Sequence, residues 1–368
     1  MTALTPIKAG FLPLLDSVLL VLAREKGFAE AQGIDLHLVR ETSWANIRDR
    51  AAVGHFDIAQ MLAPMPLAAT LGLTPLAVNM IAPMVFGLGN NAVTVSADLW
   101  SAMADAGAPG NLDALVTGQA LARVVSAAPR KLRFGVVHQT SAHNYELRYW
   151  LAASGVMPDR DVEIVVLPPS LLPDALGAGG IDGYCVGEPW NSVGVATKGA
   201  HIATVKASIW RSSPDKVLGM RASWARDNPE ILSALIRAMH FAAIWCGDSA
   251  NHAEVAGIMS PWMGGSISGR DTCGRCRISM CHMTTRPIFP GRAMRCGSIR
   301  RWYAGARSAF RPPWPVRRPP RSVLTSIARP WPLSGLRFRL PTSAWNRRCL
   351  LGWWTGWPWA PKASLTVE

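Results

Sequence analysis

Two stretches of the chain repeat one pattern, and this pattern restricts the fold more than any other feature. Asp57 and Asp182 each open a short apolar run, and a proline follows seven positions later, at Pro64 and at Pro189. A helix-like segment comes after each proline. Because proline is tolerated in the first turn of a helix, each stretch is interpreted as a buried strand that leads into a helix. Two such units predict two similar α/β lobes.

The rest of the first 262 residues follows the same rhythm of strands and helices. Expected strands are Ile7–Phe11, Ile34–Arg40, Phe56–Leu62, Leu76–Pro83, Asn91–Ser96, Leu132–Val137, Val162–Leu167, Ile181–Val186, His201–Val205 and Lys216–Ser223. Alternation with helices is typical of parallel strands with right-handed crossovers. Helix N-termini after strands offer free N–H groups and the positive end of a dipole. We therefore expect a ligand cleft for a small anion where the lobes face each other.

The order of these elements predicts the division of the chain. Residues 1–96 form the first part of lobe 1, residues 97–205 form lobe 2, and residues 206–262 return to lobe 1. Residues 263–368 form a separate tail. No helical or strand periodicity continues into this tail, and its Arg, Pro, Gly and Ser content predicts disorder.

The net charge of +14 belongs to the tail alone. Residues 1–262 carry 19 basic and 22 acidic side chains, whereas residues 263–368 carry 18 arginines and one lysine against two acidic residues. The part expected to fold is therefore slightly acidic, which argues against direct binding of nucleic acid. A nucleic-acid interpretation depends only on the Arg- and Trp-rich tail, which contains eight of the 16 tryptophans.

The start of the chain predicts a cytoplasmic protein with no membrane span. The residues before Pro6 have no basic segment, apolar segment or cleavage site of a secretory signal. The apolar run Leu14–Ala23 is too short to cross a bilayer and contains Asp16. Only Cys185 and Cys246 precede the tail, so no disulfide framework is expected. A true start farther upstream would restore a periplasmic location.

Five motifs, in order, carry a resemblance to a known family. They are SWANIRDR (Ser43–Arg50), LAPMPLA (Leu62–Ala68), the run His143–Gly155 with LRYWLAASG, DGYCVGEPWN (Asp182–Asn191) and DKVLG (Asp215–Gly219). Together they resemble the nitrate/bicarbonate-binding proteins of ABC importers and their cytoplasmic nitrate-sensor relatives. The resemblance implies an α/β fold of the two-lobed, periplasmic-binding-protein-like type II. It implies a binding protein, not an enzyme, and no cofactor or metal.

The resemblance also implies ligand-binding residues. Lys216 matches the position that gives nitrate an ammonium, where bicarbonate binders are expected to have a carboxylate and a metal ion. An ammonium with three donors suits an anion with three acceptor oxygens. His143 matches an anion-contacting histidine, and Trp44 could donate its indole N–H. Asn91 stands where family members often have Gln. By residue type alone, Lys216 could equally be a solvated lysine and Trp44 a core residue.

Three more residues complete the predicted site. Gln60 is a polar residue inside an apolar strand and could face the cleft or pair in the core. Glu188 and Trp190 flank Pro189 at a helix start. A carboxylate there could cap the helix, but beside an anion it would repel unless it held Lys216 or His143 in place, so a positioning role is expected for Glu188.

The expected ligand is nitrate or nitrite, and the expected role is that of a cytoplasmic nitrate sensor. In that role the resemblance implies an RNA-binding antiterminator as partner, whereas an importer role implies an ABC permease. A different class is an enzyme like those of thiamine-pyrimidine synthesis, with His143, Cys185 and Glu188 as possible actors. No nucleophile and base stand at motif spacing, which favours binding.

A frameshift explains the composition of the tail. When the third base of each codon is joined to the first two bases of the next, Arg277–Pro290 becomes compatible with DFHVSYDDPANFPW and Ala293–Gly305 with HALWIYSQMVRWG. Both strings resemble the C-terminal part of the family, so the tail is interpreted as out of frame from between Trp262 and Asp271. The zinc-knuckle spacing of Cys273, Cys276, Cys281 and His282 is then accidental. Resequencing of the DNA at this junction tests the interpretation.

Overall fold

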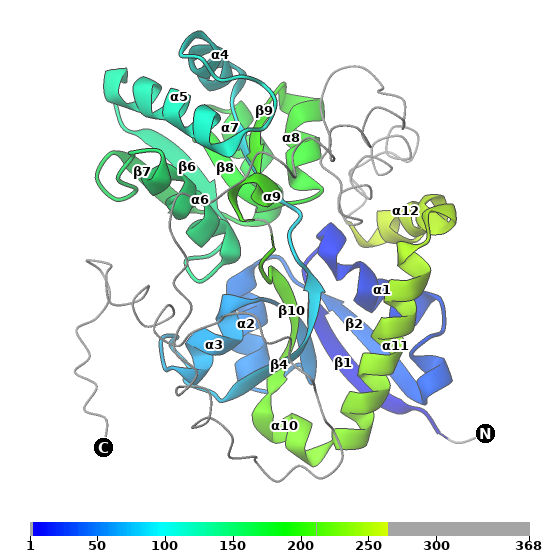
Figure 1. Cartoon of the computed structure of the whole chain (residues 1–368). Helices are drawn as coiled ribbons and strands as arrows, with labels where there is room; N and C mark the ends of the chain where they lie inside the picture. The colour runs from blue at the N-terminus through cyan, green and yellow to red at the C-terminus, as the bar shows by residue number, and fades with distance from the viewer. Residues whose placement is uncertain (1–2, 211, 264–368) are drawn as a thin grey trace, which may run out of the picture. The chain divides into compact units, whose positions relative to one another are not determined.

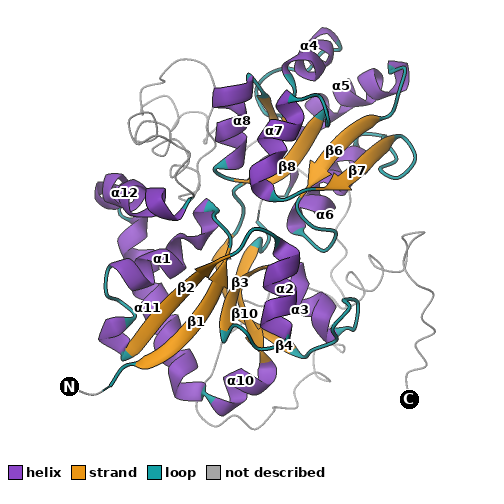
Figure 2. Cartoon of the chain, turned by 180° about the vertical axis from the view of Figure 1, so that it is seen from behind, coloured by secondary structure: helices purple, strands orange, loops and turns teal. Residues whose placement is uncertain are grey.

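A computed structural model describes residues 3–210 and 212–263 of the chain. These residues form two five-stranded sheets with helices on both faces of each (Figures 1 and 2). The prediction of two α/β lobes is therefore confirmed. The predictions for the tail, including disorder and the zinc-knuckle spacing, concern residues that lie outside the described part.

The first sheet has the strand order β2-β1-β3-β10-β4. Its strands are β1 (Thr5–Phe11), β2 (Ile34–Arg40), β3 (Ile58–Leu62), β4 (Met80–Gly87) and β10 (Lys216–Arg221). Strand β1 pairs in parallel with β2 and β3, as the βαβ rhythm predicts. Strand β10 returns from the second lobe and pairs antiparallel with β3 and β4. The start of β10 therefore lies beside the carboxyl end of β3.

Two hydrophobic clusters cover the faces of this sheet. On one face lie η1 (Leu15–Ser17), α1 (Val18–Glu25), α11 (Pro229–Gly247) and α12 (His252–Trp262), and on the other lie α2 (Trp44–Ala52) and α3 (Pro64–Thr70) (Figure 1). The Ser43 side chain accepts a hydrogen bond from Asn46 N and caps α2. This cap fixes the helix start and sets Trp44 in the first turn. Shorter elements are η2 (Glu30–Gln32), α10 (Ala222–Asp227) and η4 (Ser249–Asn251).

The second sheet has the order β7-β6-β8-β5-β9. Its strands are β5 (Asn91–Val95), β6 (Leu132–Val136), β7 (Val162–Val166), β8 (Gly183–Gly187) and β9 (His201–Val205). The helices are α4 (Ala97–Asp105), α5 (Ala114–Ala127), α6 (Ala142–Ala153), η3 (Pro169–Leu171), α7 (Leu172–Gly177), α8 (Trp190–Lys198) and α9 (Lys206–Ile209). Residues of α4, α5 and α6 build one core, whereas Leu172, Tyr184 and Val186 join Trp44 and Met61 of the first lobe in another. One apolar cluster therefore spans both lobes.

The structure corrects two expectations about strands. Asn91–Val95, expected within the first-lobe range 1–96, pairs with β8 and β9 in the second sheet. The strand expected at Leu76–Pro83 is instead Met80–Gly87, because its extent is set by pairing with β10. Apolar periodicity shows which residues can be buried but not which distant strand they pair with, so the sequence could place neither feature. Pro83 is tolerated because β4 is an edge strand.

Helix α11 is, within the described residues, the one helix long and apolar enough to cross a membrane. It has 19 residues and a mean hydropathy of 1.2 in its most apolar window. Ala234, Leu235, Ala238, Met239 and Ala242 form a buried stripe at helical spacing and belong to the same core as α1. The core of a globular protein accounts for such a stripe without a membrane.

The chain crosses between the sheets twice. It passes from β4 to β5 through residues 88–90, and from α9 to β10 through residues 210–215. The two crossings lie side by side, because the Asp215 N–H donates to Gly87 O at 3.1 Å. Polar side chains gather at these crossings, where they meet the ends of strands from both lobes.

Candidate functional site

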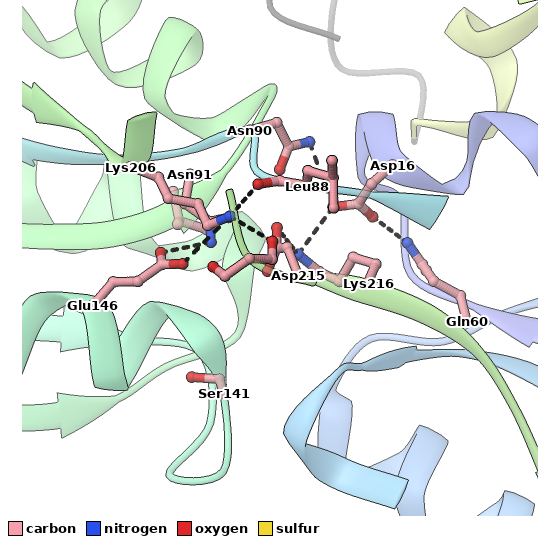
Figure 3. A network of polar contacts seen from close by, with 12 residues as sticks. Asp16, Gln60, Leu88, Asn90, Asn91, Ser141, Glu146, Lys206, Asp215 and Lys216 are labelled. Atoms are coloured by element: carbon pink, nitrogen blue, oxygen red, sulfur yellow. Dashed lines mark hydrogen bonds and ion pairs between the residues drawn. The ribbon is translucent and has the colours of Figure 1, made fainter. Parts of the chain in front are cut away.

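The candidate site is a buried polar network at the two crossings (Figure 3). It brings together side chains from the carboxyl ends of parallel strands and from the starts of the antiparallel strands β5 and β10. Both kinds of strand end meet at the same edge of a sheet, which is where ligands of open α/β sheets bind. The order of the elements in the sequence points to this same edge, and the ligand site there stays a prediction.

Lys216 lies at the centre of this network and is fully buried. Its Nζ donates to Asp215 Oδ2 at 2.9 Å and lies 3.0 Å from Asp16 Oδ2. Burial lowers the pKa of Lys216, but the two carboxylates outweigh burial and raise it above its usual value, so the side chain is an ammonium. An ammonium has three N–H donors, and the described carboxylates occupy two of them. The third donor can serve a ligand.

Asp16 and Gln60 hold this ammonium from the first lobe. Gln60 Nε2 donates to Asp16 Oδ1, and Gln60 Oε1 accepts from Leu12 N at 2.9 Å. Both residues are buried, and Asn90 Nδ2 also donates to Asp16 at 3.4 Å. Gln60 therefore orients Asp16, and through it Lys216. Of the two interpretations of Gln60, the structure supports pairing inside the network.

His143 and Trp44 offer buried N–H groups without a partner in the described structure. His143 is fully buried in the first turn of α6, and neither of its ring nitrogens has a hydrogen-bond partner. Burial, with Lys216 nearby, lowers the pKa of His143 to about 3, so the ring is neutral and has one N–H donor. The Trp44 indole N–H is also unpartnered, and its ring centroid lies 5.7 Å from Lys216 Nζ. Unpaired buried donors of this kind are the groups that a bound anion would satisfy.

Asn91 connects the crossings to helix α6. Its Nδ2 donates to Glu146 Oε2 at 2.9 Å, while its own Oδ1 has no partner in the described structure. Glu146 is fully buried, and burial, followed by the charge of Asp215, raises its pKa to about 7. Glu146 was not among the predicted residues, although it falls inside the recognised run His143–Gly155.

Lys206 is a second buried ammonium that the sequence did not reveal. Its Nζ donates to Leu88 O in the first crossing and to Ser213 O at 2.7 Å in the second. It also lies 3.9 Å from Glu146 Oε1. Lys206 therefore ties both crossings to the second lobe. In the sequence it follows a strand as an ordinary polar residue, and only the pairing of the crossings brings it into the network.

The backbone at Gly89, in the first crossing, passes close to the Lys206 side chain, and this gives a testable prediction. Its φ is +134°, a conformation that favours glycine, and a Cβ atom there would collide with the Lys206 side chain. We expect Gly89→Ala to destabilise the full chain by about 1–3 kcal/mol in urea unfolding. The control Gly247→Ala has no positive φ and meets no atom within 4 Å, so it should change stability little. Equal midpoints for the two variants would contradict this role of Gly89.

Glu188 and Trp190 lie at the start of α8, as predicted, but they are less closely tied to the ammonium. Glu188 Oε2 accepts from Ser192 N at 3.1 Å, which is the capping role, and its Oε1 has no described partner. Burial raises the pKa of Glu188 to about 7. No described contact joins its carboxylate to Lys216 or His143, so the positioning role stays a prediction. Trp190 is half-buried, packs against the cluster that spans both lobes, and has an unpartnered indole N–H.

The site is closed to solvent in this structure. Gln60, His143 and Lys216 each expose 0% of their surface. A hollow of about 360 Å³ lies elsewhere, on the second lobe, and is lined by Lys131, Arg148, Pro158, Asp159, Val162, Glu163 and Ile164. Entry of a ligand requires the groups from the two lobes to separate.

Fold and site define the class of a two-lobed solute-binding protein, with the α/β type II fold of periplasmic binding proteins. The chain belongs to the NMT1-like family, whose model matches residues 2–260. Its relatives are named for the binding or import of solutes. The expected fold class is thereby confirmed.

Named relatives of the chain include transport proteins of Synechocystis. The chain is 39% identical over 251 residues to the nitrate import ATP-binding protein NrtC of Synechocystis. The matched region covers 67% of this chain and 36% of NrtC. It is 37% identical to the bicarbonate transport ATP-binding protein CmpC of Synechocystis. That match covers 69% of this chain and 37% of CmpC. The crystal structure of the periplasmic nitrate-binding protein NrtA from Synechocystis is 28% identical, with a TM-score of 0.63, and covers 70% of this chain and 66% of that one. The chain thus spans about a third of the length of NrtC and CmpC.

Proposed function

We propose that this chain binds one small oxyanion, nitrate or nitrite, between its two lobes. The observation that carries the proposal is the fully buried ammonium of Lys216, with one donor left for a ligand, beside the unpartnered N–H groups of His143 and Trp44. Removing a small anion from water costs several kcal/mol unless aligned donors replace its hydration. Donors from both lobes supply this replacement when the lobes close. The names of NrtC and NrtA support nitrate as the ligand.

Bicarbonate is the natural competitor, because CmpC is a bicarbonate transport protein. Bicarbonate carries an O–H group that needs an acceptor, whereas nitrate offers only acceptors. The groups proposed to meet the ligand are donors, namely Lys216, His143 and Trp44. We therefore propose that the site prefers nitrate.

Nitrate is expected to raise the thermal midpoint of the full chain. A ligand at about 100 times its Kd stabilises the native state by about 2.7 kcal/mol, which corresponds to a rise of roughly 3–5 °C for a protein of this size. The measurement is thermal unfolding with potassium nitrate, nitrite or bicarbonate, with equal potassium chloride as the salt control. A rise with bicarbonate alone, or equal curves in nitrate and chloride, would contradict the proposal.

We further propose that the protein works in the cytoplasm as a nitrate sensor that releases an RNA-binding antiterminator when the anion binds. The import names of its relatives support a second candidate, the binding component of an ABC importer. Affinity purification of the full chain from cells with and without nitrate distinguishes them. Nitrate-sensitive recovery of an RNA-binding protein supports the sensor, and recovery of a permease from the membrane fraction supports the importer.

A further inference from the structure

The network contains more buried carboxylates than buried ammoniums. Within the described residues it holds Asp16, Glu146 and Asp215 against Lys206 and Lys216, all of them almost fully buried. His143 adds no charge because its ring is neutral. When all three carboxylates are ionised, an incoming monovalent anion joins a site that is already negative by one unit. In a buried, dry site this excess is unfavourable, because charges interact strongly at low dielectric constant.

Of these three carboxylates, Glu146 is the one with no ammonium within hydrogen-bond distance. Asp16 is met by Gln60, Asn90 and Lys216. Glu146 accepts only from Asn91, through Oε2, while its Oε1 has no hydrogen-bond donor. Lys206 Nζ lies 3.9 Å from that Oε1, beyond hydrogen-bond distance.

We propose that Glu146 makes anion binding proton-linked, in that the anion enters together with one proton from solvent, which binds to Glu146 Oε1. This inference rests on the proposed function and deepens it. The proton cancels the added charge, and it turns a bare acceptor into an O–H donor that can face an acceptor oxygen. Glu146 thus lets a buried site with more carboxylates than ammoniums accept an anion.

The groups around Glu146 agree with this role. Its charged neighbours are Asp215 on the second crossing, Lys206 on α9 and Lys216 on β10. Burial raises the pKa of the Cys185 thiol on β8, and the charge of Glu146 raises it further. Burial is the largest influence on Glu146 and Asp215 the next, and together they raise its pKa to about 7. In the unliganded protein the proton is therefore held below about pH 7 and lost above it.

The direction of the pH dependence follows from this. Below about pH 7 Glu146 already carries the proton, so anion affinity is constant. Above that pH the anion must recruit the proton, and the Kd should rise about tenfold per pH unit. Glu146→Gln places a permanent neutral donor at the same position and should remove this slope. At pH 8.5 the variant should bind nitrate roughly 30-fold more tightly than the parent.

The test is isothermal titration calorimetry of the full chain with potassium nitrate from pH 6 to pH 9. At pH 8.5, titrations in buffers of different ionisation enthalpy count the protons taken up by the unmodified protein, which needs no variant to fold. We expect about one proton per anion, a tenfold slope for the parent and none for Glu146→Gln. Glu230→Gln, at an exposed position of α11, is the matched control and should keep the parent's slope of Kd against pH. Thermal unfolding checks that each variant is folded.

Three results would overturn the inference. The first is a parent Kd that stays constant from pH 6 to pH 9 with no proton uptake. The second is a Glu146→Gln variant that keeps the full slope, which would assign the proton to another buried carboxylate, Asp16 or Glu188. The third, no binding of nitrate even at pH 6, would overturn the proposed function and the inference with it. Binding at pH 6 without a slope at higher pH separates failure of the inference from failure of the function.

Discussion

Replacing Lys216 with glutamate should abolish the rise in thermal midpoint that nitrate produces. The substitution removes the ammonium that faces the proposed ligand and places a third carboxylate beside Asp16 and Asp215. Like charges in a buried site repel both one another and an incoming anion. We expect nitrate affinity to fall by a factor of 100 or more, equivalent to about 2.7 kcal/mol or more. Thermal unfolding of the full chain with and without potassium nitrate measures the loss.

Lys216→Glu could also prevent folding, so a matched pair of variants makes the test independent of that outcome. Asp16→Asn keeps the ammonium, whereas the double variant Asp16→Asn with Lys216→Met removes one positive and one negative charge together. We expect the single variant to keep its response to nitrate and the double variant to lose it. Lys131→Glu, at an exposed position, is the surface control. A nitrate response that survives in the double variant would exclude Lys216 from the site.

Replacing Lys206 with methionine should cause the largest loss of stability at the crossings. Methionine removes the donor to Leu88 O and Ser213 O and leaves Glu146 without its nearby cation. Breaking a buried ion pair by removing one partner typically costs about 3–5 kcal/mol. Urea unfolding of the full chain measures this loss as a lower midpoint.

The matched control for Lys206 is Lys198→Met. Lys198 pairs with Asp174 at 2.8 Å, but the Asp174 side chain is 70% exposed, so water screens the interaction. Its loss should change the free energy of unfolding by about 0.5 kcal/mol or less. If both variants unfold at the same midpoint, Lys206 does not tie the two crossings together.

Local patterns predicted most of the described elements. Strands Ile34–Arg40 and His201–Val205 have the expected bounds, and β6 differs by one residue, because apolar periodicity is a signal within a short segment. The assignment of β5 to the second sheet and the shift of β4 depend on pairing with distant strands. Short-range patterns contain no information about such pairing.

Sequence reasoning singled out several residues that the structure places at the candidate site. Lys216, Asn91 and Gln60 lie in the buried polar network, and His143 is buried at the start of α6. The contribution of these residues to binding stays a proposal. Asp16, Glu146 and Lys206 were missed as site residues because single acidic or basic residues in a sequence are usually solvated. A signal was present for Asp16, since a charge inside the apolar run Leu14–Ala23 needs a buried partner.

The most direct test of the account is a crystal structure of the full chain grown with nitrate. The account predicts one nitrate between the two sheets, with an oxygen about 3 Å from Lys216 Nζ and others within hydrogen-bond distance of the His143 and Trp44 N–H groups. Nitrate found only on the surface, with all three of these donors still turned away from it, would contradict the central claim.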